Sequence, residues 1–291
     1  MCPGVRPLMP ESEATAWVVL VLYGPLPEDL WRFAAVLQQQ GLHLALVDNN
    51  PAPLPPWPGL RAGLWLHQAN RGGLAGGFNA GVQAALAAGA DWITLLDQDS
   101  RLEPAGLALL RQAWQRWPEQ RWLVGPVIVD QATGVRHGRW QARDGDYDST
   151  RLLISSGTTF RAADWSLLGM LDEELWIDFL DHAWCFRAQS RGFQLLQDRR
   201  VPLLQAFGEP HPSPLCRRLG MQLYSPFRHY TSLRNLRWLV LQPQIPLDLK
   251  LKELLKMLFK PWLWLLCEPQ RRANLGAIRR GLCDPLPQTG R

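Results

Sequence analysis

Short hydrophobic runs alternate along the chain with segments in which apolar residues recur every three to four positions. The runs, such as WVVLVLY at 17–23, predict buried strands, and the longer repeat predicts helices. Pro27, Glu28 and Asp29 together are typical of a helix start. The expected strands are 17–23, 43–48, 64–68, 92–97, 122–130, 152–160, 193–197 and 201–207, and the expected helices are 28–39, 74–88, 104–117 and 181–191.

Strands and helices alternate over residues 17–97, and this order predicts a βαβαβ unit of the nucleotide-binding type. The chain is therefore expected to be an α/β protein. A polar stretch at 131–150 predicts a loop or hairpin, and a change of composition at 208–216, GEPHPSPLC, predicts a boundary. We expect one domain over 12–211 and a helical tail over 212–291.

The composition narrows the class of protein. With 291 residues, of which 47% are hydrophobic and 20% charged, the chain can bury a large core, and disordered, collagen-like and disulfide-stapled classes are excluded. Five cysteines without C-x-x-C spacing predict reduced thiols rather than a zinc knuckle. Residues 1–17 lack the apolar core of a secretory signal, and no window reaches the roughly 20 apolar residues of a membrane span. We therefore expect a cytoplasmic protein.

The net charge of +5 is unevenly distributed. Residues 1–211 carry 17 Lys and Arg against 22 Asp and Glu, whereas residues 212–291 carry 14 against 4. A cationic tail on an acidic body indicates an anionic partner, with a solvated basic surface as the alternative. No nucleic-acid-binding motif accompanies the charge, so a phospholipid surface is preferred over nucleic acid.

The tail contains one amphipathic segment. At helical spacing, five leucines share one face and four lysines share the other: Leu247, Leu251, Leu254, Leu255 and Leu258 against Lys250, Lys252, Lys256 and Lys260. Pro261 follows, and then Trp262 and Trp264, whose side chains suit the level of lipid headgroups. The pattern favours a helix on an anionic membrane surface over a helix packed on the body with its lysines in solvent.

Two carboxylates, Asp97 and Asp99, come at the end of the expected strand 92–97. In an open α/β sheet, ligands bind at the carboxyl ends of the strands. A pair of carboxylates there suits a divalent cation that also contacts phosphate oxygens. An Asp-rich turn without a ligand is the alternative.

Asp48 ends the second strand in the same way and is followed by Asn49. Asp48 either accepts a hydrogen bond from a base or ribose or only forms a turn with Asn49. Residues 70–81, NRGGLAGGFNAG, then place glycines at a helix start, where backbone N–H groups approach an anion or the helix packs closely on the sheet. The chain has neither G-x-G-x-x-G nor a P-loop motif.

A third acidic segment places Asp178 and Asp181 before the expected helix 181–191. Their spacing of three lets them share one helical face, where one carboxylate perturbs the other. A carboxylate here is either a general base for a hydroxyl or a helix cap.

Taken in order, these segments resemble the family-2 glycosyltransferases, and among them the rhamnosyltransferases that build bacterial surface polysaccharides. The resemblance covers nearly the whole chain. Its most specific segments are LLDQDS (95–100), IDFLDHAWCFRA (177–188) and RHYTSLRN (228–235). It implies a Rossmann-like GT-A fold, a nucleotide-sugar donor, with dTDP-L-rhamnose expected, and inversion at the anomeric carbon.

The resemblance also implies roles for individual residues. Asp181 takes the position of the catalytic base, and Asp97 and Asp99 those of the residues that hold Mg²⁺ or Mn²⁺, with Asp99 the direct ligand. The implied donor and nucleotide site consists of Tyr23, Asp48, Asn49, Asn70, Gly73, Asn79 and Asp97, and the implied acceptor and diphosphate region of Asp178, Trp184 and Arg187.

The chain departs from the family pattern at three places. Leu22 and Gly24 flank Tyr23 where the family has Thr and Asn, and Ala183 stands two residues after the base where the family has Glu. Gln205 stands where the family often has a histidine that binds metal or diphosphate. Gln is a poorer ligand, and His211 is the alternative nearby.

The expected activity is transfer of L-rhamnose to a polysaccharide or lipid-linked glycan, with the tail bound peripherally to the inner face of the plasma membrane. A transferase of the same fold that uses a UDP- or GDP-sugar is one alternative. The other is a catalytically lapsed relative that binds glycan or organises an assembly complex, which Ala183 and Gln205 suggest.

Overall fold

The computed structural model describes residues 14–55, 57, 63–130, 134–138, 140–205, 209–211, 213, 217–218 and 222–288. Its strands are β1 (Ala16–Leu22), β2 (His43–Asp48), β3 (Leu64–His67), β4 (Trp92–Asp97), β5 (Trp122–Asp130), β6 (Trp140–Asp144), β7 (Tyr147–Thr150), β8 (Thr159–Arg161), β9 (Gln194–Gln205), β10 (Glu209–Pro210) and β11 (Gln222–Leu223). Its α-helices are α1 (Leu30–Gln39), α2 (Gly73–Ala87), α3 (Pro104–Arg111), α4 (Ala113–Arg116), α5 (Trp165–Leu168), α6 (Leu180–Ser190), α8 (Pro226–Leu241), α9 (Leu247–Cys267) and α10 (Arg271–Cys283), with 3₁₀ turns at Ala162–Asp164 and Glu173–Leu175.

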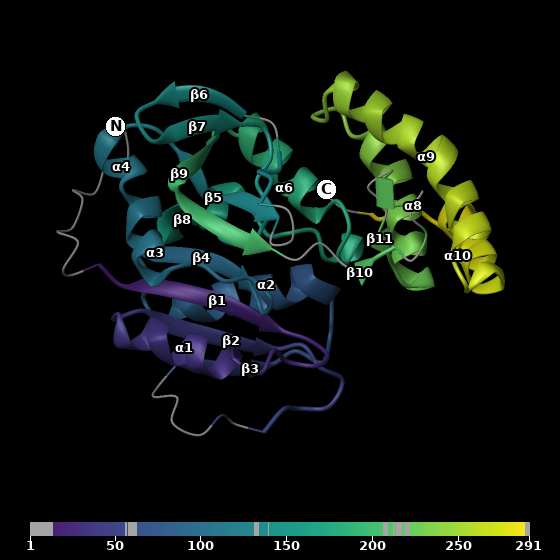
Figure 1. Ribbon diagram of the computed structural model, residues 1–291. Helices are drawn as coiled ribbons and strands as arrows, with labels where there is room; N and C mark the ends of the chain where they lie inside the picture. The colour runs from purple at the N-terminus through teal and green to yellow at the C-terminus, as the bar shows by residue number, and fades with distance from the viewer. Residues whose placement is uncertain are drawn as a thin grey trace.

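Nine of these strands form one sheet with the order β3-β2-β1-β4-β8-β5-β9-β7-β6 (Figure 1). Strands β3, β2, β1 and β4 are mutually parallel, and β8 joins them antiparallel to β4. On the other side of β8, β9 runs parallel to β5, and the β6–β7 hairpin extends the sheet along β9. The expected α/β class is confirmed.

Helices cover both faces of the sheet, and each face has its own core. One core joins α2, α5, α6 and the second part of α8 to side chains such as Val19 and Ile93. The other joins α1, α3 and α4 to the alternate side chains of the same strands, such as Leu20 and Leu96. Strands buried on both faces read as continuous apolar runs, which is why β1, β2 and β4 were visible in the sequence.

The second half of α8 is anchored in the body. Leu236, Trp238 and Leu239 of α8 lie in the same core as α2 and α6. Asn235, which is fully buried, donates hydrogen bonds through Nδ2 to the carbonyl oxygens of Leu175 (2.6 Å) and Asp178 (2.8 Å). Helix α8 therefore packs as part of the body, although it falls within the expected tail 212–291.

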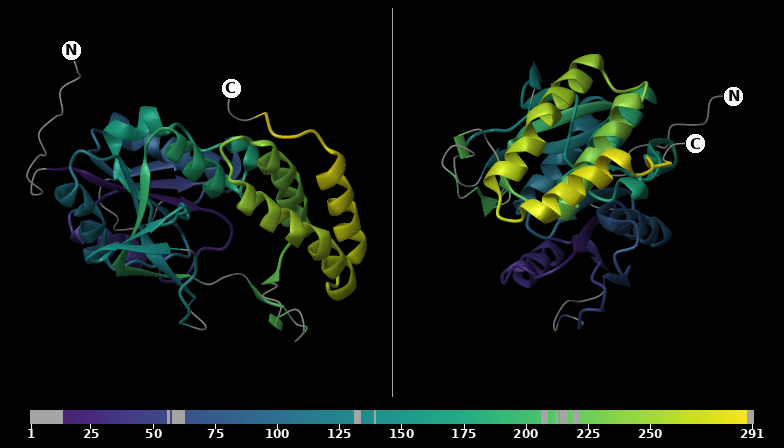
Figure 2. Two further views of the ribbon diagram at one scale, coloured as in Figure 1. Left: turned by 90° about the horizontal axis from the view of Figure 1, so that it is seen from above. Right: turned by 90° about the vertical axis from the view of Figure 1, so that its right-hand side faces the viewer.

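Helices α9 and α10 lie side by side on the outside of α8 (Figure 2). All five leucines of the amphipathic pattern are exposed, from 43% for Leu254 to 74% for Leu247. The charged side of α9 instead faces α6: burial lowers the pKa of His182 on α6 to about 4, Glu253 opposes this shift, and Lys256 and Lys252 add to it. The apolar face of α9 thus points away from the body.

Helix α9 also runs farther than the pattern suggested. Pro261 lies inside it rather than after it, and the helix continues to Cys267. The two tryptophans point in different directions, because Trp262 is 66% exposed whereas Trp264 is buried and stacks on His229 with 4.0 Å between ring centroids. No helix in the described part of the chain is both long and apolar enough to cross a bilayer.

Most expected elements are confirmed within one or two residues, with three differences. Expected strand 152–160 is a loop up to Thr158, in which the N–H of Ser155 donates to Asp181 and the hydroxyl oxygen of Ser156 accepts from the N–H of Asp97. The two strands expected near 193–207 are one strand, β9. The helix expected at 104–117 is broken into α3 and α4 at Gln112.

Several expectations fall wholly or partly on residues that the structure does not describe. They are the amino-terminal segment 1–13, the cysteines at 2 and 216, the end of the strand expected at 201–207, and most of the boundary at 208–216. The described cysteines, Cys185, Cys267 and Cys283, are free thiols.

Replacement of Asn235 by Ala is expected to lower the free energy of unfolding by about 3 kcal/mol, because it leaves two buried carbonyl groups without a donor. Urea denaturation followed by circular dichroism measures the change. Leu241→Ala on the same helix, at a side chain 66% exposed, is the control and should change the free energy by less than about 0.5 kcal/mol. Equal stabilities for the two variants would contradict the anchoring role of Asn235.

Candidate active site

The acidic residues singled out in the sequence meet at the carboxyl edge of the parallel strands. The register places Asp97 of β4 beside Val21 of β1, and Asp48 of β2 beside Leu22. The arrowheads of β1 and β2 point toward the side on which α8 lies (Figure 1). This is the edge at which ligands bind in open α/β sheets.

Asp97 and Asp99 form an incompletely satisfied pair. Asp97 is partly buried and Asp99 exposed, and Oδ1 of Asp97 is buried without a hydrogen-bond partner among the described residues. The pKa of Asp97 is raised to about 8, mainly by burial and also by the charges of Asp99 and Asp181, whereas the charge of Arg228 lowers it. Without a cation, the site therefore favours the protonated form of Asp97 at pH 7.

The donor set at this edge fits a divalent cation. An unpartnered carboxylate oxygen and mutually repelling carboxylates are what Mg²⁺ or Mn²⁺ stabilises, since both are hard cations that prefer oxygen ligands. The described residues contain no group of three or more His, Cys, Asp or Glu side chains arranged to hold a metal. Asp97 and Asp99 would therefore hold the cation together with ligand phosphate or water.

Gln205 and His211 each keep a buried polar atom without a partner among the described residues. Oε1 of Gln205 and Nε2 of His211 are buried without a partner in the described part of the chain, while Nδ1 of His211 accepts from the backbone N–H of Ser213 (3.1 Å). An antiparallel bridge between Arg101 and Leu204 brings the end of β9 beside the Asp99 turn. The geometry therefore places Gln205 close to the carboxylate pair.

Polar side chains at the end of β2 bind one another and the nearby backbone. Asp48 is fully buried, and its two oxygens accept from the backbone and side chain of Asn50 and from the backbone of Leu54. Nδ2 of Asn49 donates to the carbonyl of Gly73 (2.8 Å) and to Oδ1 of Asn70 (3.3 Å). The structure thus brings Asp48, Asn49, Asn70 and Gly73 together, with Asp48 forming the turn that was its alternative role.

The glycine-rich start of α2 is shaped by close contacts. Gly72 and Gly73 have φ of 69° and 61°, a conformation that side chains rarely adopt. A Cβ on Gly73 would lie 2.6 Å from the ring of Trp176, so this glycine admits the indole. Asn79 is enclosed: its amide bonds to the backbone of Leu171 and to Glu173, and its side chain does not reach the strand edge.

Gln98, between the two carboxylates, fixes the loop that follows β1. Its Oε1 accepts from the N–H of Tyr23 (2.8 Å), and its Nε2 donates to the carbonyl oxygens of Tyr23 (2.8 Å) and Pro25 (3.3 Å). The ring of Tyr23 is 52% exposed and therefore free to contact a ligand. The sequence pattern did not single out Gln98, because an amide that binds backbone atoms has no spacing signature.

Asp181 lies in the first turn of α6 and faces the carboxylate pair. Its Oδ1 accepts from the backbone N–H of Ser155 (2.9 Å). Burial raises the pKa of Asp181 to about 6, hydrogen bonds from Ser155 oppose the shift, and the charge of Asp178 adds to it. At pH 7 the carboxylate is mostly ionised yet basic enough to accept a proton, which suits a general base.

Asp178 connects the site to α8. Its Oδ1 accepts from Nε of Arg228 (3.3 Å), and its Oδ2 accepts from the hydroxyl of Thr231 (2.6 Å). Arg228 also lowers the pKa of Asp97, so one guanidinium acts on both carboxylates. Arg228 lies in the segment 228–235 noted in the sequence, but its partners were not deducible because 50 residues separate it from Asp178.

Trp184 and Arg187 do not lie where the resemblance suggested. Trp184 is 1% exposed, packs against Phe160 in the core, and donates through Nε1 to the carbonyl of Gly169 (3.0 Å). Arg187 pairs with Asp172 (3.0 Å) and binds the backbone of Met170. Both residues follow Asp181 along α6 on sides of the helix that pack inward, and they support the loop at 168–172 instead of an acceptor region.

Replacement of Gln205 by His is expected to tighten Mn²⁺ binding about tenfold, because imidazole is a better ligand than a carboxamide. Isothermal titration of Mn²⁺ measures the change. Gln40→His is the control, because Gln40 is an exposed residue directly after α1 and away from the strand edge; this variant should leave the Mn²⁺ affinity unchanged. An unchanged affinity in Gln205→His would show that this side chain lies outside the reach of the cation.

The fold and one sequence relative place the chain among known proteins. No protein-family model matches it. It is 26% identical over 251 residues to dTDP-rhamnosyl transferase RfbF of Shigella flexneri, an alignment that covers 81% of this chain and 83% of that protein. Its fold is similar to that of GalNAc-T7 crystallised with UDP, GalNAc and Mn²⁺, with a TM-score of 0.55, 14% identity, and coverage of 87% of this chain and 56% of that one.

A comparison with TarS of S. aureus gives a TM-score of 0.48 at 12% identity, covering 87% of this chain and 44% of that one. The chain thus spans about half the length of these two solved chains. The expected GT-A fold is confirmed by the similarity to GalNAc-T7. The shared fold and the similarity to RfbF identify the chain as a glycosyltransferase of the GT-A fold.

Proposed function

We propose that this glycosyltransferase inverts the anomeric carbon as it moves L-rhamnose from dTDP-L-rhamnose to a hydroxyl of a glycan acceptor, with Asp181 as the general base. The observation that carries the proposal is the position of Asp181, a carboxylate of pKa about 6 that faces the Asp97 and Asp99 pair. The similarity to a dTDP-rhamnosyl transferase supports the choice of donor.

The chain's own groups account for the proton transfer. The N–H of Ser155 fixes one oxygen of Asp181, which leaves the other to accept the proton of the attacking hydroxyl. The carbon–oxygen bond to the acceptor forms as the bond to the nucleoside diphosphate breaks. Asp97 and Asp99 would hold a divalent cation, which would offset the charge that the leaving diphosphate gains.

The arrangement also supports an in-line attack. Asp181 and the carboxylate pair belong to different elements, α6 and the end of β4, so different elements would position the base and the leaving group. Holding donor and acceptor in this order supplies much of the rate enhancement of such a transfer. Inversion follows because the hydroxyl enters opposite the departing diphosphate.

If Asp181 is the general base, replacing its carboxylate by a neutral amide should cause a large loss of activity. Asp181→Asn is expected to lower kcat about 10²–10⁴-fold and to leave binding of dTDP-L-rhamnose unchanged, because Asp181 acts on the acceptor proton. In the wild type, kcat/KM should fall tenfold per pH unit below about pH 6, where Asp181 becomes protonated, and level off above it.

Radiolabelled sugar transfer measured from pH 5 to pH 8 tests both points. Asp178→Asn is the matched control, because it removes a neighbouring charge that raises the pKa of Asp181, so its acidic limb should move to lower pH while transfer persists. Wild-type transfer by Asp181→Asn would refute the assignment. Competition among dTDP-, UDP- and GDP-sugars identifies the donor, and absence of any transfer with Mn²⁺ present would favour the lapsed relative that binds glycan only.

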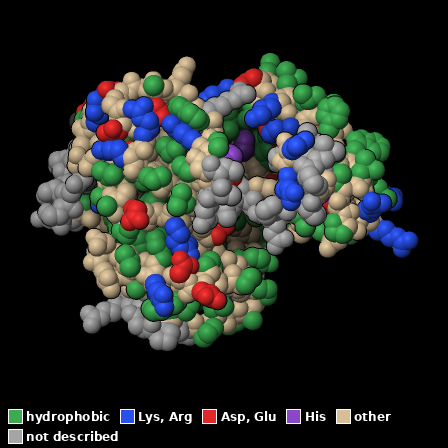
Figure 3. Space-filling model, viewed as in Figure 1, with side chains coloured by type: hydrophobic (Ala, Val, Ile, Leu, Met, Phe, Trp, Pro, Cys, Tyr) green, Lys and Arg blue, Asp and Glu red, His purple; other side chains and the backbone are tan. Residues whose placement is uncertain are grey.

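We also propose that the outer face of α9 rests on an anionic membrane. The helix exposes a continuous apolar strip, and hydrophobic side chains gather on the outer edge of this part of the molecule (Figure 3). The strip consists of Leu247, Leu251, Leu254, Leu255, Leu258, Phe259, Trp262 and Leu266. Adjacent α10 exposes Arg271, Arg272, Arg279 and Arg280, which complement anionic lipid headgroups.

Replacement of Leu251, Leu255 and Leu258 together by Ser is expected to weaken binding to phosphatidylglycerol vesicles about tenfold or more, because each exposed leucine loses apolar contact with lipid. Vesicle co-sedimentation measures the bound fraction. The control replaces Trp31 and Val36 by Ser in the same way. These side chains are 50% and 40% exposed on α1, and this variant should bind the vesicles as the wild type does. Unchanged binding by the triple variant would refute this proposal and leave the donor chemistry untouched.

A further inference from the structure

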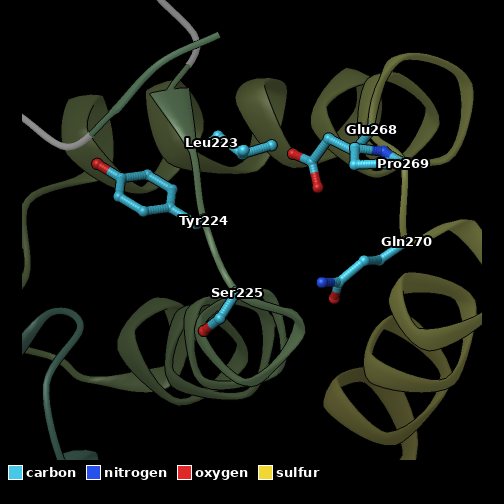
Figure 4. A pocket seen from close by; sticks show the side chains of 6 residues that line it. All are labelled: Leu223, Tyr224, Ser225, Glu268, Pro269 and Gln270. Atoms are coloured by element: carbon cyan, nitrogen blue, oxygen red, sulfur yellow. The ribbon is translucent and has the colours of Figure 1, made fainter. Parts of the chain in front are cut away.

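A small cavity lies in the helical part of the molecule, between the β11–α8 connection and the turn from α9 to α10. Its volume is about 220 Å³. Figure 4 shows the six side chains that line it: Leu223, Tyr224, Ser225, Glu268, Pro269 and Gln270. None of them belongs to the carboxylate edge described above.

Glu268 gives this cavity a fixed acceptor. Its side chain is nearly fully buried, and its Oε2 accepts from Nε2 of His229 (2.8 Å) and from Nδ2 of Asn274 (2.8 Å). Burial lowers the pKa of His229, and the hydrogen bond and charge of Glu268 oppose this shift. Oε1 of Glu268 has no hydrogen-bond partner within the described residues, although the stack of His229 on Trp264 holds the group in place.

The other polar groups converge on the same space. The carboxylate of Glu268 and the carboxamide of Gln270, from the α9–α10 turn, and the hydroxyl of Ser225, from the β11–α8 connection, line the cavity (Figure 4). Leu223 and Pro269 provide apolar walls. Acceptors and donors at fixed positions between apolar surfaces are typical of sites for small polyhydroxylated ligands.

The polar groups of the cavity narrow the ligand class. The unpartnered Oε1 of Glu268 disfavours a phosphate or another anion, because such a ligand presents acceptor oxygens where Glu268 needs a donor. A metal ion is disfavoured too, since the described residues hold no cluster of three His, Cys, Asp or Glu ligands. A neutral sugar ring, whose hydroxyl groups both donate and accept, satisfies Glu268 and Gln270 together.

The cavity is linked to the catalytic edge by adjacent residues. The guanidinium of Arg228 lies 4.4 Å from the ring centroid of Tyr224, and its Nε donates to Asp178. Asp178 in turn raises the pKa of Asp181. From this geometry we infer that the cavity is a subsite for a sugar residue of the acceptor glycan, set back from the attacking hydroxyl. The inference rests on the proposed transfer to a glycan.

Saturation-transfer NMR with methyl glycosides of L-rhamnose, D-galactose, D-mannose and N-acetyl-D-glucosamine tests the subsite. At least one glycoside is expected to bind the wild-type protein. Gln270→Trp, at an exposed residue whose side chain makes no cap bond, fills the cavity and should weaken that binding about fivefold or more. Glu268→Gln, which replaces the free acceptor by a donor of the same shape, should weaken it similarly.

Gln40→Trp, at the exposed residue that directly follows α1, is the matched control and should bind the glycoside as the wild type does. Thermal shift by dTDP, measured on the same variants, reports on the donor site alone. Two results would overturn the subsite: the wild type binds no glycoside, or Gln270→Trp binds the glycoside as well as the wild type does. If dTDP still raises the melting temperature in either case, the proposed donor stands. Glycoside binding that Gln270→Trp removes, with no dTDP shift, would support the subsite and count against the proposed donor.

Discussion

Repulsion among carboxylates at one edge of the sheet is the constraint on which the rest of the structure depends. Asp97, Asp99 and Asp181 come from the end of β4 and the start of α6, and the fold holds them close enough to perturb one another. Burial raises the pKa of Asp97 and of Asp181 and so favours their protonated forms. Local groups oppose these shifts: hydrogen bonds from Ser155 act on Asp181, and the guanidinium of Arg228 acts on Asp97.

The helices beyond the sheet complete that arrangement. Arg228 and Thr231 of α8 bind Asp178, and Asn235 binds the backbone of the same loop. The loop therefore owes its position to a segment about 50 residues later in the chain. Helix α8 thus supports the carboxylate edge, whereas the neighbouring helix α9 presents the exposed apolar side chains that are proposed to meet lipid.

The sequence predicted what depends on local pattern. Strands β2, β4 and β5 were found to the residue, because strands buried on both faces are continuous apolar runs. The meeting of Asp48 and Asp97 at one edge followed from parallel strand order. The loop at 152–158 was mistaken for a strand because its apolar start hides the serines that bind Asp97 and Asp181. Likewise, the sequence around Trp184 does not tell whether its side chain lies in the core or at a ligand site, and only the packing of the folded chain shows that it is buried.

Gln98 has a consequence for the choice of ligand. Its carboxamide joins the turn of Asp97 and Asp99 to the loop of Tyr23 by three hydrogen bonds, so these two parts of the site move as one body. The distance between the place where a diphosphate would sit and the exposed tyrosine ring is therefore set by the fold. A donor whose phosphate and base are separated by a different distance would contact either the carboxylate turn or the ring of Tyr23, but not both. Under the proposed function, discrimination among nucleotide donors would then arise from length as well as from hydrogen bonding.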